Sequence, residues 1–220
     1  MAEIKVTKET APDEDHQKHI GRFGDWAKRY NSSPMQFTVF RPVQRMTLRS
    51  LYTSLGLRDL QTAKILDIGC GTGQLLVRIG KLCPEARLFG VDPADGMIEV
   101  AREAVARKNL DIKLSEAYAE DLPYFADTFD AVTTTISFHH WADQKQGLSE
   151  VRRVLKPGGT FVLIDITSTG ALRTLLAPQD HGRFYTAPEL SEILRDAGFE
   201  TVRSQPLMHL LGSVRCYICQ

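Results

Sequence analysis

From residue 62 onward, short apolar segments alternate with longer segments of helical periodicity. The apolar runs at 63–69 and 86–92 are each followed by a helical pattern, at 73–83 and 94–109. Strands separated by helices in this way pair in parallel, through right-handed crossovers that place helices on both faces of the sheet. We therefore expect an α/β fold with a Rossmann-like sheet, whose ligand site lies at the carboxyl ends of the strands.

The same alternation continues to the end of the chain. Residues 156–159, "KPGG", predict a stop and turn after a helix, while Thr186 and Gly198 predict the start and the end of another. Further strands are expected at 111–118, 129–138 and 160–167, further helices at 144–155 and 187–199, and a closing pair of strands at 200–212 and 213–220.

Before residue 61 the pattern is helical without strands. Two segments, 20–30 and 42–57, carry apolar residues at helical spacing, and Gly56 is a plausible helix end. We expect three parts along the chain: a flexible polar tail at 1–18, an N-terminal helical cap at 19–60 and a ligand-binding domain at 61–220.

Composition excludes several classes of protein. Lys and Arg together number 27, as do Asp and Glu, so the net charge is zero and we expect no nucleic-acid partner. No apolar run reaches the roughly 20 residues of a membrane span. The N-terminus is too polar for a secretory signal and too acidic for a transit peptide, so a cytoplasmic location is expected.

The four cysteines are too few and too scattered for a disulfide framework. Cys216 and Cys219 are three positions apart in an expected strand, so their side chains should point to opposite faces. We therefore expect no metal site.

The stretch "ILDIGCGTGQLL", residues 65–76, places a glycine loop between the first strand and its helix. Glycine permits positive φ and close approach of a ligand to the backbone. The helix start suits an anionic group, but Asp67 just before the loop repels phosphate and attracts a cation. The G-x-G-x-G spacing also differs from the G-x-G-x-x-G of dinucleotide loops. Together these features favour a ligand that carries an ammonium and a carboxylate.

Asp92 ends the second strand, about 20 residues after the loop, where a carboxylate can accept both hydroxyls of a ribose. This position also fits a nicotinamide cofactor, and an aspartate here can instead cap the helix that follows. Met97 can cover an adenine face or simply belong to the core.

Four segments in order resemble the motifs of class I S-adenosylmethionine-dependent methyltransferases. They are "ILDIGCGTGQLL", "VDPADGMIEVAR", "AEDLPYFADTFDAVTTTISFHHW" and "EVRRVLKPGGTFVLID". The resemblance covers roughly residues 63–220 and is greatest to the small-molecule branch that includes ubiquinone/menaquinone biosynthesis C-methyltransferases. It implies S-adenosylmethionine as cofactor and a seven-stranded sheet with an antiparallel last strand.

The resemblance also implies roles for particular residues. The amino-acid end of the cofactor would be held at the glycine loop, the ribose by Asp92, and the adenine beside "AEDLP". Relatives usually carry an aspartate where this chain has Tyr118, so the adenine contact differs here. The implied cofactor-binding residues are Tyr30, Asp67, Gly69, Cys70, Gly71, Gly73, Asp92, Pro93, Met97, Tyr118, Ala119, Glu120 and Thr135.

A base is needed only if the acceptor must lose a proton, because a sulfonium methyl is already activated. His139 and His140 in "FHHW" follow the fourth strand and are candidate bases, although such a pair can instead shape the loop. His181 is a further candidate.

Aromatic residues of the cap favour a small, partly apolar or aromatic acceptor, or simply form helix-packing core. They are Trp26, Tyr30, Phe37 and Phe40, together with Met46. The fourth strand is followed by "TTIS" rather than an "NPPY"-type sequence, which argues against methylation of amino groups on nucleic-acid bases or glutamine.

The sequence therefore predicts an S-adenosylmethionine-dependent methyltransferase that acts on a small molecule, with C- or O-methylation favoured. Two alternatives are an S-adenosylmethionine-binding protein without methyl transfer, which would be a regulator or another kind of enzyme, and an NAD(P)-dependent oxidoreductase. The oligomeric state, monomer or homodimer, is left open by the sequence.

Overall fold

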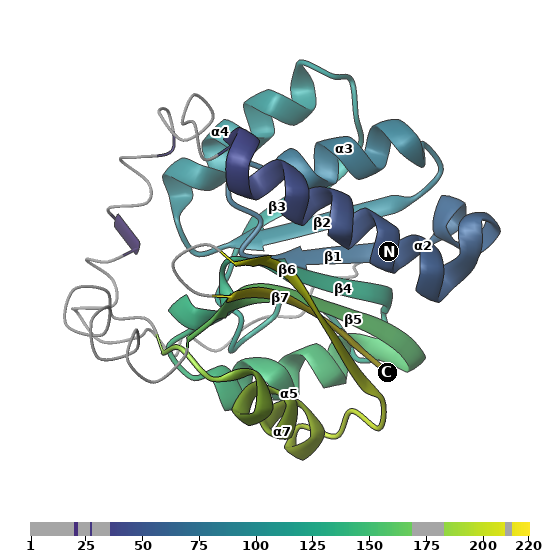
Figure 1. The fold of residues 1–220 in the computed structure, drawn as a ribbon. Helices are drawn as coiled ribbons and strands as arrows, with labels where there is room; N and C mark the ends of the chain where they lie inside the picture. The colour runs from purple at the N-terminus through teal and green to yellow at the C-terminus, as the bar shows by residue number, and fades with distance from the viewer. Residues whose placement is uncertain (1–19, 22–26, 28–35, 169–182, 210–212) are drawn as a thin grey trace.

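The described residues form a seven-stranded sheet, in the order β3-β2-β1-β4-β5-β7-β6 (Figure 1). The computed structural model describes residues 20–21, 27, 36–168, 183–209 and 213–220. Neighbouring strands are parallel, except that β7 runs antiparallel to β5 and to β6. The strands are β1 Lys64–Ile68, β2 Arg87–Asp92, β3 Ile112–Glu116, β4 Phe129–Thr135, β5 Leu155–Thr167, β6 Val202–His209 and β7 Ser213–Cys219. The predicted Rossmann-like fold with an antiparallel last strand is confirmed.

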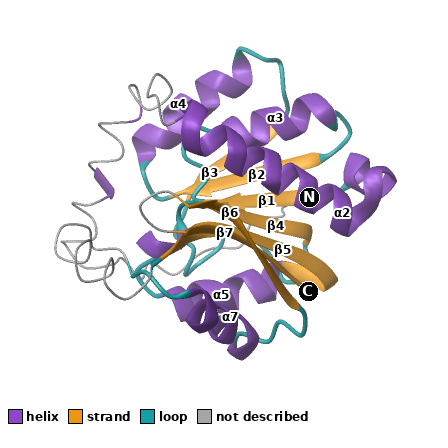
Figure 2. Cartoon of the chain, in the orientation of Figure 1, coloured by secondary structure: helices purple, strands orange, loops and turns teal. Residues whose placement is uncertain are grey.

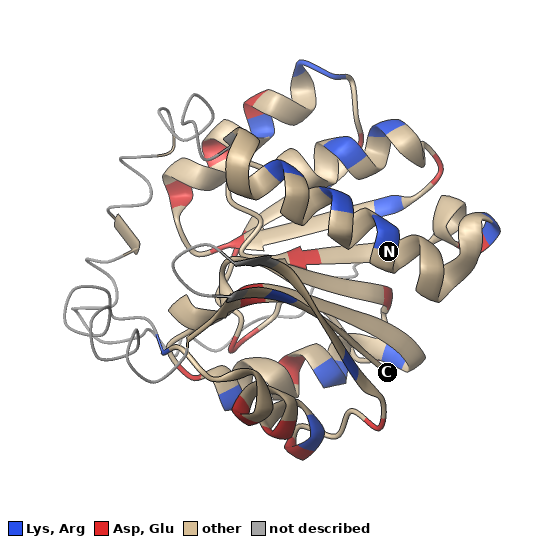
Figure 3. Ribbon diagram, in the orientation of Figure 1, with Lys and Arg blue, Asp and Glu red and all other residues tan. Residues whose placement is uncertain are grey.

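Helices cover both faces of this sheet (Figure 2). On one face lie α2 Arg41–Thr62, α3 Gln74–Leu82 and α4 Asp95–Ala106, and on the other lie α5 Gln144–Val154 and α7 Ala187–Asp196. Lys and Arg positions are frequent along α2 and α3, whereas Asp and Glu positions are frequent along α4 and α7 (Figure 3). The neutral total charge is thus distributed unevenly among the helices.

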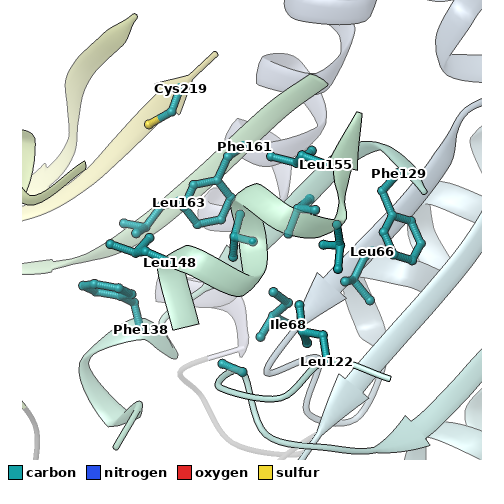
Figure 4. Close-up of a cluster of buried hydrophobic side chains, with 14 of the residues drawn as sticks. Leu66, Ile68, Leu122, Phe129, Phe138, Leu148, Leu155, Phe161, Leu163 and Cys219 are labelled. Carbon is teal, nitrogen blue, oxygen red and sulfur yellow. The ribbon is translucent and has the colours of Figure 1, made fainter. Parts of the chain in front are cut away.

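Successive residues along the strands belong to two separate hydrophobic cores, one on each face of the sheet. In β5, Phe161 and Leu163 belong to the core under α5 and α7, whereas Val162 and Ile164 belong to the core under α2 and α3. Figure 4 shows the first of these, where Leu148 of α5 lies beside the strand residues. Cys219 belongs to this core and Cys216 to the other, so the two thiols lie on opposite faces as their spacing indicates.

The "KPGG" segment differs from its prediction in one respect. The helix ends at Val154 as expected, but β5 is assigned from Leu155 and includes residues 156–159. The pairing to β4 jumps there, because Phe129 pairs with Leu155 and Ala131 pairs with Thr160. Gly158 has φ +74°, so the predicted turn is an irregularity inside the strand rather than a separate loop.

Gly56 ends the first of two helical segments within α2, as predicted. α2 runs from Arg41 to Thr62, but Gly56 has the non-helical angles φ +77° and ψ 160°, so a second segment begins after a kink there. Most of the predicted helix at 20–30 lies outside the described residues, and the division into tail, cap and domain stays a prediction. The predicted start of α7 is present as a capping box, in which Thr186 accepts from Glu189 N–H and the Glu189 side chain accepts from Thr186 N–H.

β1 lies inside the sheet, with β2 on one side and β4 on the other. The chain order of the strands reverses there, which is the position where open α/β sheets bind ligands. None of the helices in the described ranges is long and apolar enough to cross a membrane.

Candidate functional site

The glycine loop connects β1 to α3 by a backbone that other residues rarely adopt. Gly69, Gly71 and Gly73 have φ of +68°, +53° and +71°. The N–H groups of Gly69 and Cys70 both donate to Val91 O, which fixes the loop against the end of β2. A Cβ on Gly71 would meet no atom within 4 Å. The loop therefore leaves open space beside Gly71, where a ligand can approach the backbone.

Asp92 is the last residue of β2, and its carboxylate bonds to the glycine loop. Its Oδ2 accepts from Gly71 N–H at 2.8 Å and its Oδ1 accepts from Ala94 N–H at 3.0 Å. The second bond holds the turn before α4, but the N-cap of that helix is Ala94 and no side chain caps it, so the capping alternative is not confirmed. Each carboxylate oxygen has further acceptor capacity, and Asp92 also lines a cavity, so its backbone contacts leave room for the expected ribose.

Asp67 is a second buried carboxylate near the loop. Its Oδ1 accepts from the Thr133 hydroxyl at 2.7 Å. Burial raises the pKa of Asp67 to about 7, although the Thr133 bond lowers it, and repulsion from Asp92 adds to the rise. Burial likewise raises the pKa of Asp92 to about 6, against the lowering effect of its two backbone bonds. No ion pair with either carboxylate is found within the described part of the chain, so a cationic ligand would supply the missing countercharge.

A cavity opens beside these groups at the carboxyl ends of β1, β2, β3 and β4. It encloses about 810 Å³ of empty space, counting its open mouth. Residues from all four strand ends line it: Ile68, Gly69, Gly71, Asp92, Pro93, Ala94, Met97, Ala117, Tyr118, Ala119, Glu120, Thr135, Ile136, Ser137, His140 and Trp141, together with Ile20.

A smaller cavity of about 370 Å³ lies on the other side of the loop. Gly69, Gly71 and Thr135 line both cavities. Asp67 and Cys70 line only the smaller one, with Phe40 and Gln44 among the further walls. Both cavities therefore border the glycine loop and Thr135.

Most of the predicted cofactor residues thus lie around this space. Gly73 lines neither cavity, because it faces α4, where a Cβ on it would lie 3.2 Å from Ala101 Cβ. Tyr30 and His181 lie outside the described residues, as does Trp26. Met97 is both a lining residue and a member of a small core with Ala94, so both of its predicted roles are compatible with the structure.

The two histidines of "FHHW" differ in position. They form a short 3-10 turn, η2 Phe138–His140, directly after β4. His140 lines the larger cavity. His139 is buried and lines neither cavity, and its Nδ1 lies 2.6 Å from Asp165 Oδ1. Their ring centroids are 3.9 Å apart.

Several residues of the site were missed by sequence reasoning. Ile136 has φ +50° in the wall after β4, and a β-branched residue gives no signal for that conformation. Ser137 lies so close to Gly69 that a Cβ there would overlap its side chain. Asp165 did have a signal, because it is an acidic residue near the carboxyl end of a predicted strand beside β4.

The family model described as "Methyltransferase domain" matches residues 65–159. These residues contain the glycine loop, Asp92 and the strand ends that form the cavity. Over these residues the chain is similar to a methyltransferase domain.

The chain is similar in sequence to two methyltransferases of bacteria. The demethylmenaquinone methyltransferase of Deinococcus radiodurans is 38% identical over 102 residues, which are 46% of this chain and 42% of the relative. The ubiquinone/menaquinone biosynthesis C-methyltransferase UbiE of Geobacter sulfurreducens is 33% identical over 151 residues, 66% of this chain and 57% of the relative. The chain thus spans about half the length of these relatives.

Among solved structures, the [4+2]-cyclase SpnF is similar with a TM-score of 0.64. It is 26% identical, and the match covers 74% of this chain and 59% of SpnF. A fold similar to that of this chain is therefore also found in a protein described as a cyclase.

The cofactor implied by the methyltransferase domain is S-adenosylmethionine, and the residues present fit it. Its ammonium and sulfonium are cations, and two buried carboxylates flank the space beside Gly71 without a cationic partner among the described residues. The apolar Met97 and the ring of Tyr118 line the same cavity as Asp92.

Proposed function

We propose that the protein transfers a methyl group from S-adenosylmethionine to a small, partly apolar or aromatic acceptor, at carbon or oxygen. The observation that carries this proposal is the pair of buried carboxylates, Asp67 and Asp92, on either side of the open space at Gly71. A phosphate-bearing dinucleotide would be repelled by this pair, which counts against an NAD(P)-dependent oxidoreductase.

In this proposal, Asp67, Gly69, Cys70 and Gly71 bind the amino-acid end of the cofactor, and Asp92 binds its ribose. The nucleoside lies against Pro93, Met97, Tyr118, Ala119 and Glu120. Thr135 lines both cavities, between the two ends of the ligand.

When bound, S-adenosylmethionine supplies a methyl group on a positively charged sulfur. The protein's contribution is then to hold donor and acceptor in line and to exclude water. Ile136, His140 and Trp141 form the wall after β4, so they are the residues that we assign to the acceptor side. Both named relatives are described by ubiquinone or menaquinone methylation, which favours an aromatic, apolar acceptor here.

Binding is tested first, by calorimetric titration of the purified full chain with S-adenosylhomocysteine. We expect saturable binding that NAD⁺ and NADP⁺ do not compete with. Absence of binding, or tighter binding of a nicotinamide dinucleotide, would contradict the proposal.

Transfer is tested separately, by incubating the protein with methyl-labelled S-adenosylmethionine and an extract of small metabolites. A labelled small-molecule product that depends on the protein supports transferase activity. The product's chemistry then distinguishes methylation at carbon from methylation at oxygen.

A second candidate function is a protein that binds S-adenosylmethionine without transferring its methyl group. The similarity to the cyclase SpnF favours it. Tight S-adenosylhomocysteine binding without any labelled product in the extract experiment would support this second function over the first.

A further inference from the structure

A groove between α2 and α3 is rich in positively charged side chains. Its empty space, counting the open mouth, is about 1220 Å³. Arg41 and Arg45 line it from α2, and Arg78 and Lys81 line it from α3. The two residues of each pair are three or four positions apart, so both cations lie on the same side of their helix. Each wall of the groove therefore carries a row of positive charge (Figure 3).

No acidic side chain in the neighbouring sequence balances this charge. Residues 36–58 and 68–84 contain neither Asp nor Glu. Arg49, which is exposed and follows Arg45 by four positions, extends the row on α2. Within the described ranges, none of these cations forms an ion pair. In a chain of zero net charge, this surface is a local concentration of positive charge that attracts anions.

Large apolar side chains are exposed among these cations. Phe37 is 62% exposed and Leu82 is 58% exposed, and both line the groove. Tyr52 is 50% exposed and follows Leu48, another lining residue, by about one helical turn. The Arg41 guanidinium lies over the Phe37 ring, 4.2 Å from its centroid. Because transfer of such side chains from water to an apolar phase is favourable, this surface can bind apolar material as well as anions.

We propose that this surface, the α2–α3 face, docks the protein on an anionic lipid bilayer. The arginines and Lys81 bind headgroup phosphates, which suit the planar donors of arginine. Phe37, Tyr52 and Leu82 enter the boundary between the headgroups and the acyl chains. The contact is with the bilayer surface and does not depend on the proposed function. The α2–α3 face consists of Phe37, Arg41, Arg45, Leu48, Arg49, Tyr52, Arg78, Lys81 and Leu82.

An acidic segment of a partner protein is the alternative occupant. It would match the cations, but the cores of protein–protein interfaces are depleted in charged residues. On the α2–α3 face, cations and exposed apolar side chains instead alternate along the chain, from Phe37 through Arg45 to Tyr52. A lipid boundary accepts both kinds of side chain at once, because its phosphates lie next to its acyl chains. The alternation therefore favours lipid.

Co-sedimentation of the full chain with vesicles tests the proposal. One set of vesicles contains phosphatidylcholine and phosphatidylglycerol, and the other contains phosphatidylcholine alone. We expect binding to the anionic vesicles to be tighter by about tenfold or more, and to weaken as salt is added. Absence of binding to the anionic vesicles, or equal binding to both sets, overturns the proposal.

A triple variant assigns the binding to the face. Arg45→Gln, Arg49→Gln and Lys81→Gln together remove three exposed cations. We expect them to weaken binding to the anionic vesicles by about 50-fold or more, since each cation near an anionic surface contributes separately.

The matched control removes the same charge elsewhere. Arg102→Gln, Arg107→Gln and Lys108→Gln replace three exposed cations at α4 and just after its end. This control should bind within about threefold of the unmodified protein, because salt screens charges that lie far from the contact. Equal losses in the two triple variants would mean that net charge alone causes binding, and would overturn the docking face.

Insertion of the apolar side chains is tested by fluorescence quenching with brominated phosphatidylglycerol vesicles. Leu82→Trp places a reporter on the α2–α3 face. Phe125→Trp is its control, because Phe125 is 52% exposed but does not line the groove. We expect the tryptophan at position 82 to be quenched more strongly, and equal quenching of the two variants contradicts the insertion.

A soluble polyglutamate peptide distinguishes an acidic protein partner from lipid. If the peptide binds to the unmodified protein and the anionic vesicles do not, the partner is an acidic protein segment and the proposal is wrong. The substituted side chains are all exposed, so circular dichroism should show every variant folded. Loss of S-adenosylhomocysteine binding by the unmodified protein would contradict the proposed function and leave the vesicle result standing.

Discussion

At the scale of single residues, the Asp92 carboxylate connects two backbone segments before any ligand binds. It accepts from Gly71 in the glycine loop and from Ala94 at the start of α4. The proposed ribose contact and these two backbone contacts would then be uses of one side chain. Its replacement removes both, so affinity and stability should fall together.

We expect Asp92→Ala to weaken S-adenosylhomocysteine binding by about 1–3 kcal/mol, because a charged hydrogen-bond partner of the ligand is lost. Calorimetric titration measures this directly. Glu103→Ala, which removes an exposed carboxylate from α4, is the control and should bind normally. An unchanged dissociation constant in Asp92→Ala would refute the ribose assignment.

The raised pKa values of Asp67 and Asp92, about 7 and about 6, predict a pH dependence of stability. A carboxyl whose folded-state pKa exceeds its unfolded value of about 4 binds its proton more tightly when folded. Its contribution is complete below about pH 4 and is lost as the pH rises through the folded pKa. We therefore expect the melting temperature of the ligand-free protein to fall between about pH 4 and pH 7.

Asp67→Asn should flatten this decline, because it removes the group with the larger shift. Circular dichroism melts of both proteins across the pH range provide the comparison. Parallel melting curves for the two proteins would mean that Asp67 is not the cause.

At the scale of elements, the site depends on loops that meet across the sheet edge. The turn after β4 packs against the loop after β1, since Ser137 lies where a side chain on Gly69 would project. Gly71, two residues later, faces open space instead. A side chain at position 69 would collide with Ser137, whereas a side chain at position 71 would occupy the space that we propose for the ligand.

This difference predicts opposite behaviour of two substitutions. Gly69→Ala should lower the free energy of unfolding by about 1–3 kcal/mol, from positive φ and the collision with Ser137. Gly71→Ala carries only the cost of the left-handed backbone, about 1–2 kcal/mol, but should lose S-adenosylhomocysteine affinity. Urea unfolding and calorimetry separate the two effects.

A second substitution checks the packing explanation. Adding Ser137→Gly to Gly69→Ala should recover part of the lost stability, because it removes the colliding side chain. A double variant that is less stable than either single variant would contradict this explanation.

At the carboxyl ends of the strands, the sequence predicted the strands and loops better than the side-chain contacts between them. The glycine loop and Asp92 follow from local pattern and spacing. The approach of Ser137 to Gly69 and the pairing of His139 with Asp165 join residues far apart in the chain, which no local pattern encodes. "KPGG" and Gly56 show a related limit, because both mark real breaks that the surrounding strand and helix absorb.

At the scale of the whole molecule, the sheet separates two hydrophobic cores. Leu148 of α5 is fully buried in one, and Ile79 of α3 is fully buried in the other. Alternation along the buried strands made this division predictable, because successive side chains point to opposite faces. The strand order and the position of β7 instead follow from the resemblance to a family, not from local pattern.

The separation predicts additive effects of core substitutions. Leu148→Ala should cost about 2–5 kcal/mol and Ile79→Val about 0.5–1.5 kcal/mol, from lost burial and the cavities that remain. Because the residues share no partners across the sheet, the double variant should equal the sum within about 0.5 kcal/mol. Urea titrations measure all three, and a larger coupling would mean that strain passes through the sheet.

The antiparallel strand has a consequence for the order of folding. β7 follows β6 in the chain but lies between β5 and β6, and it is the strand through which β6 joins the sheet. During synthesis, β6 leaves the ribosome before its docking site exists. β6 therefore has no neighbouring strand in the sheet until residues 213–219 are made, and it joins the sheet only through its pairing with β7.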